Sequence, residues 1–518
     1  MNPQPSRREF LAAVSAAPWP ALPARRLPNI VLILADDMGY GDPQCYNPES
    51  KIPTPNLNRL AASGIRFTRA HTPSAVCTPT RYGLLTGRYC WRTRLKAGVL
   101  DGFDPPLIEQ GRWTLASMLK RHGYETACVG KWHLGMQWTA RDGSRVPFRA
   151  DPESGFRPGF DVDFTHPVTG GPNDAGFDWY YGISASLDMS PYCFIENRRT
   201  VGVPDIRTPE DRSLWMNQAP GLRTKDFTLE GVLPELTRKA TAYIRERQGK
   251  NKLFFLYVAL TSPHLPIVPN REFEGRSKAG RYGDFVAETD AAVGAILDAL
   301  EAASAAGDTL VLFTSDNGGL WHWWEFREAD DVAFGKISAR GQNAKSYGHQ
   351  SNGPWRGTKA DIWEGGHRVP FIVRWPGHIQ PGSVSDQLAV LVDLMATFAE
   401  ITGARLPSDA GEDSFSLLPA LLHRKPTRPP REHAVYHSLR GEFAVEQGDW
   451  KLMLHRGSGG FSIPREVRPK PGEPVGQLYN LRTDPHETQN VYAEHPDIVE
   501  RLSRLLEKIQ REERSAPR

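Results

Sequence analysis

Short, continuously apolar runs alternate with amphipathic segments along most of this chain. The apolar runs are rich in β-branched and aromatic residues and have the length of buried strands. They lie at 29–35, 126–130, 253–260 and 309–314, and segments with helical spacing lie at 55–63, 113–122, 233–247 and 284–303. Strands that are apolar on both sides and separated by helices are typical of a parallel sheet covered on both faces. The sequence therefore predicts an α/β fold with a large, mostly parallel sheet.

A polar motif follows each of these predicted strands. In chain order the motifs are Asp36-Asp37, Lys131-Trp132-His133, Ser262-Pro263-His264 and Asp316-Asn317-Gly318. Open α/β sheets place their sites beyond the carboxyl ends of parallel strands. We therefore expect the functional site at this edge of the sheet.

Two parts of the chain lack this alternation. Residues 137–230 are rich in Gly, Pro, Asp and aromatic residues, which indicates an insertion near the active site rather than a separate domain. From about residue 430 the pattern changes to short strands at 444–445, 450–454 and 477–481 and a helix at 496–513. We predict a catalytic domain over 27–429 and a small α+β C-terminal subdomain over 430–518.

The N-terminal 26 residues are typical of a signal peptide. The segment Ser6-Arg7-Arg8-Glu9-Phe10-Leu11 precedes a short run of small and apolar residues. It resembles the twin-arginine export signal, and a chance basic pair before an ordinary secretory signal is the alternative. We expect residues 1–26 to direct the protein to the periplasm or the exterior.

Composition excludes several other classes. A net charge of +3 gives no bias toward nucleic acid. No apolar stretch reaches about 18 residues, so no membrane span is expected. The five cysteines, Cys45, Cys77, Cys90, Cys128 and Cys193, form no CxxC pair, so a zinc cluster is not indicated.

The most specific motif is Cys77-Thr78-Pro79-Thr80-Arg81, which continues to Leu84-Leu85-Thr86-Gly87-Arg88. Here the chain resembles the type I, formylglycine-dependent sulfatases, an arylsulfatase-like family of the alkaline phosphatase superfamily. The family carries serine more often than threonine at the position of Thr80. A buried structural cysteine is the alternative for Cys77 alone. The resemblance implies an alkaline-phosphatase-like sandwich and oxidation of Cys77 to formylglycine by a maturation enzyme.

The same resemblance implies a metal site with Asp36, Asp37, Asp316, Asn317 and the formylglycine from Cys77 as ligands. Oxygen donors of this kind suit a hard cation, and we expect one Ca²⁺. Related phosphonate and phosphodiester hydrolases carry Asp-His where this chain has Asp316-Asn317. Imidazole favours a transition metal, so the Asp-Asn pair favours the sulfatase over that alternative.

The resemblance also implies catalytic roles. His133 serves as the base that collapses a formylglycine–sulfate intermediate, and His264 and Lys359 act on the leaving oxygen. Lys131 offsets developing negative charge, and Arg81 holds the geometry of the formylglycine and the metal ligands. A catalytically dead binding protein would require an unmodified Cys77.

The predicted reaction is hydrolysis of a sulfate ester. An exported chain with 14 Trp residues, several of them in loops, favours a sulfated sugar as the substrate. Some polar and aromatic residues fit either a pocket wall or structural packing. They are Trp138, Asp188, His322, Trp323, Trp324 and His349.

Overall fold

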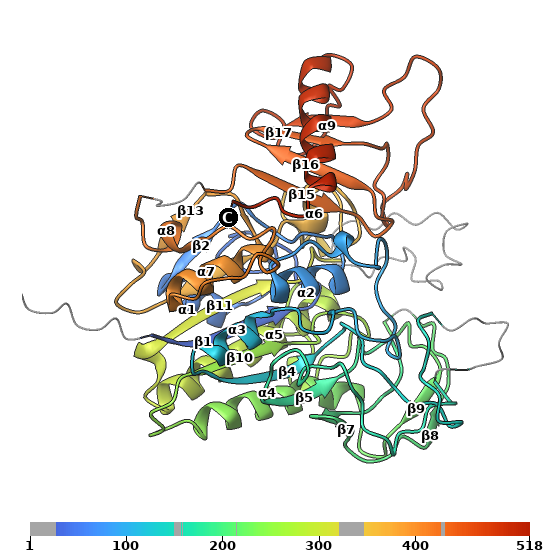
Figure 1. The fold of residues 1–518 in the computed structure, drawn as a ribbon, viewed down its shortest axis with the longest axis vertical. Coiled ribbons are helices and arrows are strands. Elements are labelled where there is room, and N and C mark those ends of the chain that lie inside the picture. Colours follow the sequence, from blue (N-terminus) through green and yellow to red (C-terminus); the bar gives the residue numbers. More distant parts are fainter. Residues whose placement is uncertain are drawn as a thin grey trace, which may run out of the picture.

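A ten-stranded mixed sheet runs through the larger part of the molecule (Figure 1). The computed structural model describes residues 27–149, 157, 159–213, 215–320, 347–425 and 430–517. The sheet order is β13 (Ser383–Ser385), β2 (Ile65–Phe67), β12 (Phe371–Arg374), β11 (Thr309–Ser315), β1 (Asn29–Ala35), β10 (Phe254–Ala259), β4 (Glu125–Lys131), β5 (Trp179–Ile183), β6 (Ile195–Glu196) and β7 (Arg199–Thr200). The predicted signal peptide at 1–26 and His322, Trp323 and Trp324 lie outside the described residues.

The centre of the sheet is parallel. Strands β11, β1, β10, β4 and β5 pair in parallel, with Ile33 of β1 opposite Val258 on one side and Phe313 on the other. Antiparallel pairs appear only toward the edges, where β12 joins β11 and β6 joins β5. The predicted large, mostly parallel sheet is confirmed.

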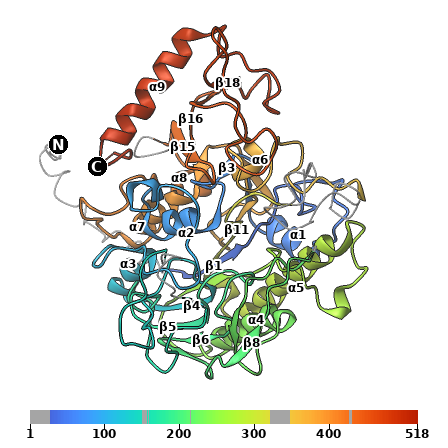
Figure 2. The ribbon, with the colours of Figure 1, turned by 90° about the vertical axis from the view of Figure 1, so that its right-hand side faces the viewer.

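Helices cover both faces, as a buried parallel sheet requires. On β1, Ile30, Leu32 and Leu34 pack in one core and Val31, Ile33 and Ala35 in another. The first core includes α2 (Cys77–Thr86), α3 (Leu115–Arg121) and α7 (Leu394–Thr402). The second includes α1 (Pro55–Ala62), α4 (Leu229–Arg245) and α5 (Gly280–Ala302). Figure 2 shows the two groups of helices on opposite sides of β1 and β11.

Capping side chains set the starts of two predicted helices. Thr114 and Ser117 form a reciprocal capping box at α3, which begins two residues later than expected. Thr228 accepts a hydrogen bond from the Gly231 amide at α4, which therefore begins one turn before the predicted residue 233. Pro234 lies inside α4, whereas proline is normally tolerated only in the first turn of a helix. A proline at this position therefore suggests a helix that starts near residue 233.

The segment 137–230 is more than an insertion. It contains β5, which pairs in parallel with β4 and extends the main sheet. The run Trp-Tyr-Tyr-Gly-Ile is short and has no preceding helix, so it lacks the alternation that identified the other strands. The same segment also holds a two-stranded ribbon of β8 (Ile206–Thr208) and β9 (Gly221–Arg223).

A separate four-stranded antiparallel sheet forms the upper end of the molecule in Figure 1. Its strands are β15 (His433–His437), β16 (Phe443–Gln447), β17 (Trp450–Met453) and β18 (Gln477–Asn480). Helix α9 (Pro496–Arg511) packs on it through Leu502, Leu506 and Ile509. The predicted small α+β unit is confirmed, with β15 as a strand that the sequence did not indicate. The remaining elements are β3 (Ala70–His71), β14 (Ala389–Val390), α6 (Glu364–His367) and α8 (Leu418–Leu421).

A buried ion network joins this C-terminal sheet to the main body. The Lys451 ammonium of β17 lies 2.9 Å from a carboxylate oxygen of Glu364 and 2.9 Å from one of Glu487. All three side chains are excluded from solvent, and the Glu364 amide donates to the second oxygen of Glu487. Glu364 begins α6, five residues after Lys359, so the network holds the segment that carries a predicted catalytic lysine.

Among the described residues, no helix is both long and apolar enough to cross a membrane. All five cysteines lie in the described part and are unpaired.

Replacing Lys451 with methionine should destabilise the protein strongly. The change leaves Glu364 and Glu487 buried without their shared cation, which costs about 3–5 kcal/mol. Denaturant unfolding of K451M, compared with the exposed-site control K470M, measures the loss. Equal stability of the two variants would show that the network does not hold the two units together.

Candidate active site

The polar motifs predicted from strand ends meet at one edge of the main sheet. The Asp36 amide donates to the Ser262 carbonyl at 3.0 Å, and the Asp316 amide donates to the Ala35 carbonyl at 3.1 Å. The Asp37 amide donates to Oδ1 of Asp316 at 3.2 Å. Parallel register between β1, β10 and β11 therefore brings residues nearly 300 positions apart in sequence into direct contact.

Cys77 begins helix α2 and faces this edge. Its Sγ and ligand atoms of Asp36, Asp37 and His264 all lie within 4.8 Å of one another. The Cys77 side chain is buried, as is every residue of α2. The cysteine of the sequence motif is thus packed among the predicted metal ligands rather than in an apolar core.

Arg81 lies one turn after Cys77, on the same face of α2. Its Nε and Nη2 both donate to Oδ2 of Asp316, at 3.0 and 2.8 Å, and its Nη1 donates to the Lys131 carbonyl at 3.1 Å. Burial opposes the charged guanidinium, but Asp316 and Asp36 raise the pKa of Arg81 above its usual value. Arg81 therefore fixes both α2 and the end of β4 to Asp316.

Two lysines neutralise the paired aspartates. The Lys131 ammonium donates to Oδ2 of Asp36 at 2.7 Å, and the Lys359 ammonium donates to Oδ2 of Asp37 at 2.9 Å. Burial opposes the charge of Lys359, yet Asp37 raises the pKa of Lys359 above its ordinary range. With Arg81 on Asp316, each carboxylate has its own cation.

Two buried oxygen atoms in this cluster have no hydrogen-bond partner. They are Oδ1 of Asp36 and Oδ1 of Asn317. The Asn317 amide nitrogen donates to Oδ1 of Asp37 at 2.7 Å, which leaves its carbonyl oxygen as an acceptor without a donor. Unpaired buried oxygens are costly, and a hard divalent cation accepts such oxygens as ligands. The donor set therefore fits an oxygen-ligated cation.

His133 follows β4 and is neutral. Its Nε2 lies 2.7 Å from the Leu100 carbonyl, so Nε2 carries the proton and donates, while Nδ1 is buried without a partner. Burial and the charges of Lys131 and Arg81 hold the pKa of His133 well below its usual value. Nδ1 of His133 is thus available as a proton acceptor.

His264 has the opposite electrostatics. Its Nδ1 lies 2.6 Å from the Leu265 carbonyl, and its Nε2 lies 3.8 Å from Oδ2 of Asp37. Burial and the charge of Lys359 oppose protonation, but Asp37 and Asp36 outweigh them and raise the pKa of His264 to about 9. The two imidazoles that border the cluster therefore have pKa values shifted in opposite directions.

Three non-glycine residues in or next to the site adopt left-handed backbone angles. The φ angles are 67° at Asp37, 53° at His133 and 77° at Ala360, the residue after Lys359. Such conformations cost about 1–3 kcal/mol each and concentrate at functional sites. Gly318 allows a further close approach, because a Cβ there would lie 1.8 Å from the Gly365 carbonyl.

Two residues considered as pocket walls have structural roles instead. Trp138 is buried and its Nε1 donates to the Gly102 carbonyl at 3.2 Å. His349 is buried, with Nε2 2.9 Å from Oδ1 of Asp42. Leu100, whose carbonyl orients His133, was not among the residues predicted from the sequence. A backbone carbonyl leaves no residue-type signal, so no motif could have identified it.

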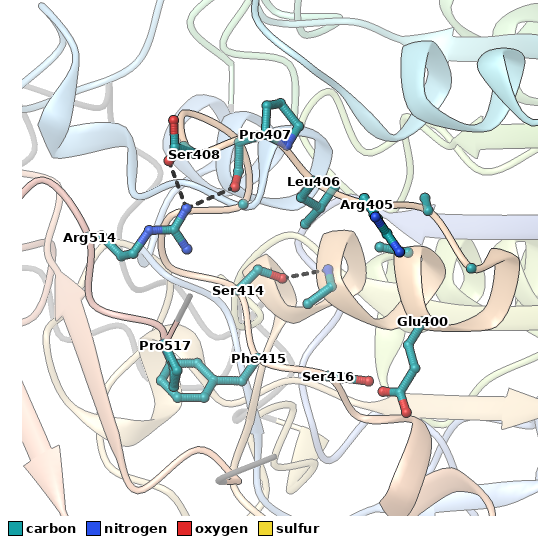
Figure 3. Close-up of a pocket in the computed structure, with 16 residues that line it drawn as sticks. Glu400, Arg405, Leu406, Pro407, Ser408, Ser414, Phe415, Ser416, Arg514 and Pro517 are labelled. Atoms are coloured by element: carbon teal, nitrogen blue, oxygen red, sulfur yellow. Dashed lines mark hydrogen bonds between the residues drawn. The ribbon is translucent and has the colours of Figure 1, made fainter. Parts of the chain in front are cut away.

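A cavity of about 730 Å³ opens elsewhere, between α7 and the C-terminal tail (Figure 3). Its lining includes Glu400, Arg405, Phe415 and Arg514, and none of the residues of the cluster described above. Arg514 is used within the fold, since its guanidinium donates to the Ser408 carbonyl at 2.8 Å. This cavity is separate from the carboxylate–cation cluster.

A mostly parallel sheet between two helical layers, with buried carboxylates and a helix-terminal cysteine at its carboxyl edge, is the arrangement of an α/β enzyme whose site lies beyond the strand ends. Comparison with known proteins makes the assignment narrower. The sulfatase family matches residues 28–404, and the N-sulphoglucosamine sulphohydrolase C-terminal family matches residues 358–458. The chain belongs to the sulfatase family and is a sulfuric ester hydrolase.

Individual members of this family are similar in sequence to this chain over nearly its whole length. An N-acetylgalactosamine-6-O-sulfatase of Bacteroides thetaiotaomicron is 33% identical over 93% of this chain and 93% of its own. Human arylsulfatase A is 32% identical over 96% of this chain and 90% of its own. A solved structure from work on glycosaminoglycan metabolism by Bacteroides thetaiotaomicron superposes with a TM-score of 0.79 at 30% identity, covering 94% of this chain and all of that one. The alkaline-phosphatase-like fold predicted from the sequence is confirmed.

Replacing Arg81 with lysine should lower sulfatase activity by about 10–100-fold, the usual effect of losing a residue that orients metal ligands. A lysine ammonium cannot donate two hydrogen bonds to Asp316 while also reaching the Lys131 carbonyl. Steady-state hydrolysis of an aryl sulfate measures the loss, with the exposed-site variant R245K as control. Activity of R81K equal to that of R245K would contradict a positioning role for Arg81.

Proposed function

We propose that this sulfatase removes sulfate from a sulfated glycan, using a formylglycine formed from Cys77 and one Ca²⁺. The observation that carries the proposal is the position of Cys77, whose Sγ lies within 4.8 Å of ligand atoms of Asp36, Asp37 and His264. The motif Cys77-Thr78-Pro79-Thr80-Arg81 supports the modification. A formylglycine there supplies a hydrated aldehyde, a nucleophile with two hydroxyls on one carbon, in place of a thiol.

The residues of the chain supply the charge and the proton transfers. A sulfate ester is an anion, and negative charge grows on its leaving oxygen as the S–O bond breaks. Lys131 and Lys359 are buried cations beside the paired aspartates and can offset that charge. His264 carries a proton at Nε2 for the leaving oxygen, since its Nδ1–H is used by the Leu265 carbonyl.

His133 is suited to the opposite step. Its Nε2–H is fixed on the Leu100 carbonyl, so the unpaired Nδ1 is the atom that takes up a proton. A lowered pKa keeps the imidazole of His133 neutral at physiological pH, as a general base requires. The two histidines therefore divide the acid and base roles.

Asp36, Asp37, Asp316 and Asn317 would hold the cation. The unpaired Oδ1 atoms of Asp36 and Asn317 support this ligand set, and an all-oxygen set supports Ca²⁺. The cation would supply positive charge that binds the sulfate group and favours its transfer.

Sulfated sugars are the proposed substrates because several relatives that match most of the chain are named for one. The Bacteroides thetaiotaomicron relative is an N-acetylgalactosamine-6-O-sulfatase. We also propose that residues 1–26 are a twin-arginine-type export signal, that the enzyme works in the periplasm or outside the cell, and that a separate maturation enzyme modifies Cys77. The domain division at residue 430 likewise stays a proposal, supported by the change from the mixed sheet to the antiparallel one.

Protein produced with a competent maturation system should carry formylglycine at position 77. Mass spectrometry of the peptide containing residue 77 should show a loss of about 18 Da relative to cysteine, a product outside ordinary thiol oxidation. The peptide with Cys128 is the internal control and should keep its thiol. The C77S variant should not turn over, and fully active protein with unmodified Cys77 would contradict the proposal.

Removal of the metal should lower thermal stability, and Ca²⁺ should restore it. A ligand that binds only the folded state stabilises it by an amount that grows with the logarithm of its concentration above Kd. Melting curves in chelator, with and without added Ca²⁺, measure the effect. The N317L variant should lose the response, and N251L, at an exposed asparagine, should keep it. A response to Zn²⁺ but not to Ca²⁺ would refute the calcium assignment.

A further inference from the structure

Two loops contact His133 through their backbones, and both carry further polar side chains. In the first loop, the Leu100 carbonyl accepts from His133 Nε2, and the Leu100 amide donates to Oγ1 of Thr78 at 3.2 Å. Thr78 directly follows Cys77, so this loop contacts both the nucleophile position and the base. The second loop follows β5, where the Ser184 carbonyl accepts from the His133 amide at 2.8 Å.

The two loops are in contact with each other. A Cβ at Gly102 would lie 2.0 Å from the Ser190 carbonyl, so the backbones meet at that point. This contact brings Asp101 of the first loop toward Asp188 of the second. Partial desolvation, together with Asp104 and Asp188, raises the pKa of Asp101, whose side chain is nevertheless exposed to solvent.

The three aspartates of these loops are used differently. Asp104 is satisfied within the fold, because its carboxylate accepts from the amides of Asp101 and Arg149 at 2.8 and 2.9 Å. Asp188 is half-buried, and its Oδ1 is shielded from solvent without a hydrogen-bond partner. Among the described residues, no hydrogen bond or ion pair involves the carboxylate of Asp101.

A hydroxyl group in the second loop also lacks a hydrogen-bond partner. Ser186 is only 2% exposed, and its Oγ has no hydrogen-bond partner in the described part of the chain. Buried polar groups are normally paired, so the unpaired Ser186 hydroxyl and the unpaired Oδ1 of Asp188, two residues apart in the loop after β5, indicate a polar ligand. Such a ligand must donate hydrogen bonds, because an ionised carboxylate only accepts them.

We propose that Asp101 and Asp188 bind the free hydroxyl groups of the sugar that carries the sulfate ester, and so determine substrate specificity. This inference rests on the proposed function. The hydroxyls of a sugar ring are donors that suit two nearby carboxylates. The same carboxylates repel a second anionic group. The preferred substrate is therefore a sugar with one sulfate and unmodified hydroxyls beside it.

Arg149 is the positively charged residue that acts on the carboxylate of Asp101. It lowers the pKa of Asp101 but forms no ion pair with it, and its Nη2 donates to the Ala97 carbonyl at 3.4 Å. It therefore does not occupy the carboxylate that the sugar would use.

The test compares two esters hydrolysed by the same matured, calcium-loaded enzyme. N-acetylgalactosamine 6-sulfate offers hydroxyls, and 4-nitrophenyl sulfate offers none. For each variant we compare kcat/KM on the sugar with kcat/KM on the aryl ester. In D101N and D188N this ratio should fall about tenfold or more, mainly because KM for the sugar rises. The expected size follows because hydrogen bonds to charged groups are stronger than those between neutral groups. The control D226N, at an exposed aspartate of the same segment, should keep the wild-type ratio.

A doubly sulfated sugar tests the charge argument. Wild-type enzyme should have a higher kcat/KM on N-acetylgalactosamine 6-sulfate than on the 4,6-disulfate. In D188N the difference between these two kcat/KM values should be smaller. An unchanged sugar-to-aryl ratio in both variants, or equal loss on both esters, would overturn the inference while leaving sulfatase function intact. Failure of the wild-type enzyme on every sulfated sugar, with aryl sulfate still hydrolysed, would instead overturn the proposed glycan substrate and this inference with it.

Discussion

Three buried carboxylates at the carboxyl edge of the sheet are each paired with a different cation. Asp36 pairs with Lys131, Asp37 with Lys359 and Asp316 with Arg81. Transferring each ion from water into the protein interior costs roughly several kcal/mol of free energy. The cluster is therefore stable only if every carboxylate has its cation correctly positioned beside it. The partners come from β4, from α2 and from the segment before α6, and the carboxylates follow β1 and β11. The cluster therefore links the positions of five separate parts of the chain.

This requirement explains the role of the C-terminal sheet. Lys359 lies on an irregular segment, where the Lys359 amide donates to the Gly319 carbonyl and the Ala360 amide donates to the Ala75 carbonyl. The segment is held at α6, where Glu364 is bound by Lys451 of β17 and by the Glu487 side chain. A second buried charge network thus fixes the backbone that presents Lys359, the proposed catalytic lysine. The C-terminal unit thereby helps to position the segment that carries Lys359.

Most of the fold and the site could be predicted because their signals are local. Continuous apolar runs identified β1, β4, β10 and β11, and parallel register then required the polar residues after them to converge. Strand β5 was not predicted because its five residues lie among loops. Strand β15 was not predicted because two of its five residues are histidines. The loop contacts at Leu100 and Gly102 are made by backbone atoms, and the sequence carries no signal for those.

The central claim is that this cluster transfers a sulfuryl group rather than a phosphoryl group. The most direct measurement is kcat/KM of the matured, metal-loaded enzyme on sulfate and phosphate esters of the same alcohol. The proposed site, with one divalent cation on oxygen ligands and a formylglycine from Cys77 as the nucleophile, should favour the singly charged sulfate ester by orders of magnitude. Equal or faster hydrolysis of the phosphate ester would contradict the account.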